Sequence, residues 1–144
     1  MSKNTHKLQK VIAEIIYLFL IFFFCYTAAN KLIRLGSFRT NLIKSTFFSK
    51  DFADVFSVLV IGLEFAIILF MLFNKTKGLL AFCFTMLIFT LYISFLHHKG
   101  LYEICGCGGI LNGLSYQYHF MINIGLIIVS LFSFYTFNFV TDEK

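Results

Sequence analysis

The fold is decided by two long apolar runs joined by five residues: DVFSVLVIGLEFAIILFMLF (54–73), NKTKG (74–78) and LLAFCFTMLIFTLYISFL (79–96). Each run is close to the roughly 20 residues that an α-helix needs to cross about 30 Å of hydrocarbon. The short polar connection is typical of a tight turn between neighbouring antiparallel helices. The middle of the chain therefore predicts a transmembrane helical hairpin.

Two further apolar runs flank this hairpin, at 11–29 and 119–140. With 59% hydrophobic and 13% charged residues, the composition lies outside the range of soluble domains. Backbone groups in lipid must be hydrogen-bonded within the segment, and these runs lack the alternation of barrel strands. The first run is also longer than the apolar core of a signal peptide, so we interpret it as a retained span. We predict an all-α, integral membrane four-helix bundle, antiparallel and formed by residues 1–144 as one domain.

The connection between the first two runs carries Leu35, Phe38 and Leu42 at helical spacing among basic residues. This pattern predicts a short interfacial helix between spans one and two. A solvated basic loop is the alternative.

The net charge of +5 does not indicate nucleic-acid binding, because the basic residues flank the spans. At such positions they contact lipid headgroups or fix the orientation of the spans in the membrane. Lysine and arginine are divided equally between the two sides, so the positive-inside rule does not choose an orientation. The lysine-rich start favours cytoplasmic N and C termini, and a cysteine pair is open to oxidation only outside the cytosol.

The connection at 97–118 concentrates two histidines, Glu103, Cys105, Cys107 and five glycines, and we place the functional site there. A disulfide between residues two apart needs a bent backbone, which Gly106 permits. Such a small ring is expected to be strained and easily reduced.

Three interpretations of this turn stay open: thiol–disulfide exchange, a permanent structural bridge and metal binding. Copper(I) accepts thiolates, with His97, His98 or His119 as further ligands, whereas zinc sites more often have cysteines spaced by two to four residues. We favour exchange, with Cys105 and Cys107 as the reacting pair and no metal assigned.

Two more cysteines lie inside predicted spans, Cys25 toward the outer end and Cys83 toward the inner end. They are therefore not expected to pair, and buried lone cysteines are mostly inert core residues. Only Cys25 is near enough in depth to receive a disulfide from the Cys105–Cys107 turn, so it is kept as a supporting residue.

Polar residues inside the spans complete the candidate site. Glu64 lies near the middle of the second span, where an ionisable side chain is costly and normally faces the bundle interior. A functional Glu64 would move protons during quinone chemistry or bind a polar lipid headgroup. A structural Glu64 would be a protonated carboxyl group that is hydrogen-bonded to a neighbouring helix. His119 and Asn123 share one helix face, which looks toward the cysteine turn or into the bundle. A histidine beside a thiol would lower the thiol pKa.

Together these features resemble the MauE/DoxX-type redox-associated membrane proteins. The resemblance rests on Asn30-Lys31-Leu32, Phe38, Leu42, Glu64, the Cys105-Gly-Cys-Gly-Gly turn, His119 and Asn123. It implies a protein of the bacterial inner membrane with a periplasmic cysteine turn, linked to a thioredoxin-like partner or an exported thiol protein. It also implies that Cys105 and Cys107 are the redox pair.

The chain departs from quinone-linked disulfide generators, because it has no second extramembrane cysteine pair. Unless Cys25 takes part, a complete relay from substrate to quinone is not expected, and exchange with a thioredoxin-like partner alone is favoured. Quinone is left open as a cofactor. The leading hypothesis is a membrane thiol–disulfide redox protein, which would make it an oxidoreductase. The alternatives are a non-catalytic membrane subunit or assembly factor with a structural disulfide, and a copper-handling protein.

Overall fold

The computed structural model describes residues 3–45, 49–101 and 114–140, and these are helical almost throughout. The elements in chain order are α1 Lys3–Ile33, α2 Leu35–Ser45, α3 Lys50–Phe73, α4 Lys75–His98, α5 Tyr116–Tyr135 and the π-helix η3 Thr136–Val140. Four helices are long and apolar enough to cross a membrane, namely α1, α3, α4 and α5 with η3. The predicted all-α fold with four spans is confirmed, and the chain is a multi-pass membrane protein.

The helices extend beyond the apolar runs that predict them. Helix α1 begins at Lys3 rather than at Val11, because apolarity marks the part suited to lipid while helix propensity continues into the polar flank. No proline interrupts any helix. The hairpin connection shrinks to Asn74, whose side chain accepts a hydrogen bond of 3.1 Å from the backbone N–H of Lys77. Asn74 thereby ends α3 and caps α4.

A glycine at the start of α4 allows that helix to approach α3 closely. A Cβ atom on Gly78 would overlap the Cα of Met71 and lie 2.7 Å from its backbone nitrogen. Met71 is itself fully buried. The hairpin therefore depends on the missing side chain at Gly78.

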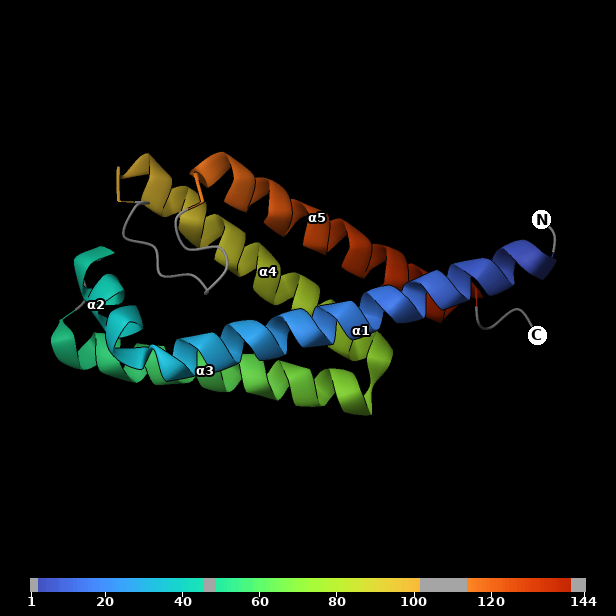
Figure 1. Cartoon of the computed structure of the whole chain (residues 1–144), viewed down its shortest axis with the longest axis horizontal. Coiled ribbons are helices and arrows are strands. Elements are labelled where there is room, and N and C mark those ends of the chain that lie inside the picture. The colour runs from blue at the N-terminus through green and yellow to red at the C-terminus, as the bar shows by residue number, and fades with distance from the viewer. Residues whose placement is uncertain (1–2, 46–48, 102–113, 141–144) are drawn as a thin grey trace.

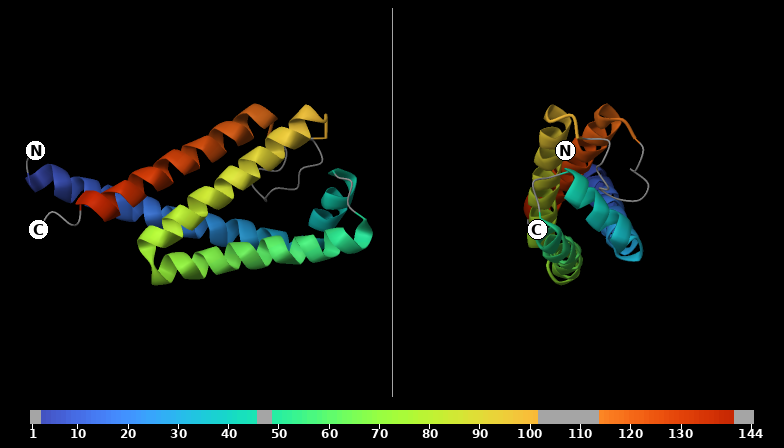
Figure 2. Two further views of the ribbon diagram at one scale, coloured as in Figure 1. Left: turned by 180° about the vertical axis from the view of Figure 1, so that it is seen from behind. Right: turned by 90° about the vertical axis from the view of Figure 1, so that its left-hand side faces the viewer.

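The four long helices form an antiparallel ring in which α1 and α4 each pack against both α3 and α5. The pair α1–α3 and the pair α4–α5 lie close together near the chain termini and diverge toward the opposite end (Figures 1 and 2). At that opposite end α1 ends, α3 begins, α4 ends and α5 begins, and α2 lies beside them (Figure 1). We call it the α2 end.

The short helix predicted between spans one and two is confirmed as α2. Its Phe38 and Leu42 are buried and pack with Ala53 and Ile61 of α3. The apolar face that we expected to lie in the membrane interface thus packs on protein. The placement of α2 relative to lipid headgroups stays a prediction.

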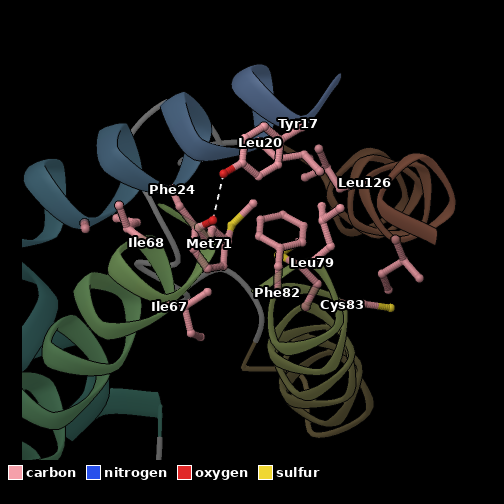
Figure 3. Packing of buried hydrophobic residues seen from close by; sticks show 13 residues of the cluster. Tyr17, Leu20, Phe24, Ile67, Ile68, Met71, Leu79, Phe82, Cys83 and Leu126 are labelled. Carbon is pink, nitrogen blue, oxygen red and sulfur yellow. Dashed lines mark hydrogen bonds between the residues drawn. The ribbon is translucent and has the colours of Figure 1, made fainter. Parts of the chain in front are cut away.

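The main core lies between the two helix pairs and is shown in Figure 3. The rings of Phe24 and Phe82 meet with centroids 4.4 Å apart, and the Tyr17 hydroxyl donates a 2.7 Å hydrogen bond to the carbonyl of Met71. Large apolar side chains also cover the outer surfaces of the long helices, as expected where lipid replaces water. This core holds the bundle together away from the α2 end.

Candidate functional site

A buried ion pair joins α1 to α3. Lys31, in the last turn of α1, donates a hydrogen bond from Nζ to Oε1 of Glu64. The two residues are only 4% and 0% exposed. Burial removes both charges from water, so each depends on the other for compensation. Ionisable residues at such positions in membrane helices are usually tied to function.

The second carboxylate oxygen of Glu64 is also buried, and among the described residues it has no hydrogen-bond partner. Leaving a buried charged acceptor unsatisfied is costly, so such an atom normally meets water or a ligand. A cavity of about 30 Å³ adjoins Glu64, which is room for about one water molecule. We call it the polar cavity.

Helix α5 contributes two polar side chains to the polar cavity. His119 and Asn123 are buried and line it together with Lys31 and Glu64. The side chains are one helical turn apart, so they present one face. The sequence leaves two orientations open for this face, toward the cysteine turn or into the bundle, and in the structure it is turned into the bundle. His119 also lies within electrostatic range of the Lys31 ammonium.

A second, larger cavity of about 120 Å³ lies between α2, α3 and α4, with Lys31 of α1 in its wall. We call it the aromatic cavity. It is lined by Lys31, Phe38, Leu42, Phe56, Val60, Ile88, Phe89 and Tyr92. The Nζ atom of Lys31 is 5.1 Å from the ring centre of Phe89 and 6.0 Å from that of Phe38, within the range of cation–π attraction. Lys31 and Phe89 line both cavities, so the ammonium lies at their common wall.

The end of α4 and the start of α5 are joined by an aromatic contact. The rings of His97 and Tyr116 are stacked, with centroids 3.9 Å apart and planes at 1°. The hydroxyl of Tyr116 is 3.0 Å from Oγ of Ser94. His97, a copper ligand in one of the sequence interpretations, is therefore part of the contact that holds these two helix ends together.

A family comparison matches residues 9–136 to the model described as Methylamine utilisation protein MauE. The chain belongs to the MauE family. The matched range of this MauE protein includes Lys31, Glu64, His119 and Asn123, and also both cysteines of the glycine-rich turn. Comparisons with curated proteins and with solved structures gave no significant match. The likeness to DoxX stays a prediction.

The structure of this MauE protein brings together three of the predicted site residues, Glu64, His119 and Asn123. It does not bring Cys25 to them, because Cys25 is exposed on α1 and lines neither cavity. Cys105 and Cys107 lie outside the described residues. Within residues 3–45, 49–101 and 114–140, no group of three or more His, Cys, Asp or Glu residues is arranged to hold a metal.

Lys31 is the site residue to which sequence reasoning assigns no role. It enters the family resemblance as part of Asn30-Lys31-Leu32 but is not among the predicted site residues, yet it is buried in the last turn of α1 and bonded to Glu64. A signal was present: a carboxylate in mid-span needs a cation, and Lys31 directly follows the first apolar run. Its assignment would have required knowing that α1 lies beside α3.

Proposed function

We propose that this MauE-family protein is a membrane thiol–disulfide redox protein that acts through Cys105 and Cys107. One cysteine thiolate attacks the disulfide of a thioredoxin-like or exported partner, and the partner's leaving thiolate takes up a proton. The second cysteine then attacks the mixed disulfide. The partner gains two electrons and two protons, and Cys105 and Cys107 are left as a disulfide. The reverse sequence oxidises a partner dithiol.

The observation that carries this proposal is the buried cluster of Lys31, Glu64, His119 and Asn123 toward the α2 end. The chain leaves α4 and enters α5 at that end, and the two cysteines belong to the segment between these helices (Figure 1). Thiol–disulfide exchange requires proton uptake and release at each sulfur. Glu64 and His119 are groups that exchange protons, and they belong to a cluster that lies toward the end of the bundle where α4 ends and α5 begins.

The arrangement of the helix ends supports the proposed orientation in a bacterial inner membrane. The start of α1 and the end of η3 lie at one end of the bundle, and the α4–α5 connection starts and ends at the other (Figure 1). If the termini are cytoplasmic, the cysteines face the periplasm. That compartment permits disulfides to persist.

The test is the redox state of the cysteine pair in living cells, trapped by acid quenching and maleimide labelling. Replacing Cys25 and Cys83 by alanine leaves Cys105 and Cys107 as the only labelled thiols. We expect a mixture of oxidised and reduced chains that shifts when respiratory quinone is depleted. A pair that stays fully oxidised under both conditions would contradict exchange and indicate a structural bridge.

A second experiment separates exchange from a structural role of the same bridge. Replacing Cys105 and Cys107 by serine is expected to abolish disulfide exchange with a partner while the helical bundle stays folded. Loss of folding or of assembly in the doubly substituted chain would instead support a non-catalytic subunit. Circular dichroism and size-exclusion chromatography in detergent report on folding and assembly.

A further inference from the structure

The aromatic cavity has the size and walls of a binding site for a small ring. Seven of its eight lining residues have aromatic or aliphatic side chains, and the eighth is Lys31. Its volume of about 120 Å³ approaches the roughly 150 Å³ of an apolar protein cavity that takes up benzene. Aromatic walls favour flat partners, because rings attract one another in stacked and edge-on arrangements.

The Lys31 ammonium gives this apolar cavity a directional contact. Lys31 lines the cavity, and its Nζ atom lies 6.0 Å and 5.1 Å from the ring centres of two other lining residues, Phe38 and Phe89. An ammonium has three N–H donors, and among the described residues one of them is used by Glu64. A donor is thus left for an acceptor atom inside the cavity.

The charge balance narrows the class of ligand. Glu64 already compensates Lys31, so an anionic phosphate would bring an uncompensated charge into an apolar site. A hydrocarbon chain would fill the space but leave the ammonium donor without an acceptor. A planar, uncharged ring with a carbonyl oxygen matches both the aromatic walls and the donor.

We infer that the aromatic cavity binds the headgroup of a membrane quinone, with a ring carbonyl accepting a hydrogen bond from Lys31. Reduction of a quinone to a hydroquinone consumes two electrons and two protons. Oxidation of a dithiol to a disulfide releases both, so the two reactions balance. The polar cavity meets the aromatic cavity at Lys31, and it brings Glu64 and His119 to the same wall for proton exchange. The electron transfer rests on the proposed thiol function, whereas binding of the ring does not.

Equilibrium dialysis with two matched ligands tests the binding. Tetramethylbenzoquinone and tetramethylbenzene share a planar six-membered carbon ring with four methyl groups, but only the quinone has carbonyl oxygens. Both are dialysed against the full-length chain in detergent micelles, with empty micelles as the blank. We expect the quinone to bind at least about tenfold more tightly, the effect of one hydrogen bond to a charged donor. Equal affinities would overturn the inference and assign the cavity to hydrocarbon.

Paired substitutions locate the binding. Val60→Phe fills the aromatic cavity and should abolish binding of the quinone, while Val58→Phe on the outer face of the same helix should leave it unchanged. The double substitution Lys31→Met with Glu64→Leu removes the donor and its counter-charge, so the preference for the quinone should disappear. Wild-type affinity in Val60→Phe, or a retained preference in the double variant, would refute the site.

Failure of this inference can be told apart from failure of the proposed function. The Cys105→Ser, Cys107→Ser chain should bind the quinone as the wild-type chain does, because it keeps Lys31 and all seven apolar and aromatic side chains to which we attribute the binding. Loss of binding in the serine chain would contradict the cavity as the site. Thiol exchange without quinone binding would leave the cysteine chemistry intact and refute the inference alone.

Discussion

Removing the cation of the buried pair should destabilise the bundle strongly. In Lys31→Met, the carboxylate of Glu64 loses its compensating charge while it stays fully buried. Breaking a buried pair by deleting one partner costs about 3–5 kcal/mol. For a chain of this size, that loss corresponds to a decrease in unfolding temperature on the order of 10 °C.

The exposed pair of Glu14 and Lys75 provides a matched control. It also joins two helices, with an Nζ–Oε1 distance of 2.7 Å, but its side chains are 37% and 47% exposed. Lys75→Met is the same chemical change at a solvated site, and exposed pairs contribute only about 0.2–1 kcal/mol. We therefore expect a small decrease in unfolding temperature for this variant.

A double substitution completes the cycle. In Lys31→Met with Glu64→Leu, the uncompensated charge is gone, so the chain should recover much of the stability lost in Lys31→Met. Helix loss on heating, followed by circular dichroism in detergent, measures all variants against the wild-type chain. The reasoning is refuted if Lys31→Met unfolds no earlier than Lys75→Met, or if the double variant is less stable than Lys31→Met.

Three further predictions follow from single sites. Gly78→Ala should lower the free energy of unfolding by about 1–3 kcal/mol, because the new Cβ atom would overlap the backbone of Met71. Gly62→Ala is the control, since a Cβ atom there has nothing within 4 Å, and thermal unfolding should show no comparable loss. Phe38→Ala should release α2 from α3 at a cost of about 3–5 kcal/mol, and faster proteolysis near α2 would report it. Cys25→Ala should leave the redox state of Cys105 and Cys107 unchanged in the maleimide assay, because Cys25 is exposed and lines neither cavity. A changed redox state would instead indicate that Cys25 takes part in electron transfer.

The sequence predicts the spans well because the signal for each one is local. A helix in lipid satisfies its own backbone hydrogen bonds, so length and apolarity of a run are enough to place it. The same locality explains α2, whose Leu35, Phe38 and Leu42 recur at helical spacing. It also explains why helix ends were predicted too short, since polar flanks such as 3–10 continue the helix without any apolar signal.

Part of the candidate site was also visible in the sequence. Glu64, His119 and Asn123 stood out because polar side chains within apolar runs need a reason to be there. The aromatic cavity had no such signal. Its Phe38, Phe56 and Phe89 are three of 21 phenylalanines, most of which pack or face outward.

The sequence by itself determined the helical membrane fold, its four spans and the few polar residues that are unusual inside apolar spans. Only the tertiary structure decided that Lys31 meets Glu64 across 33 positions of sequence, that α5 turns His119 toward them, and that Cys25 faces away. The reason is physical. A span that is apolar on all sides has little amphipathic pattern to fix its rotation, so which residues face inward depends on how the helices pack against one another.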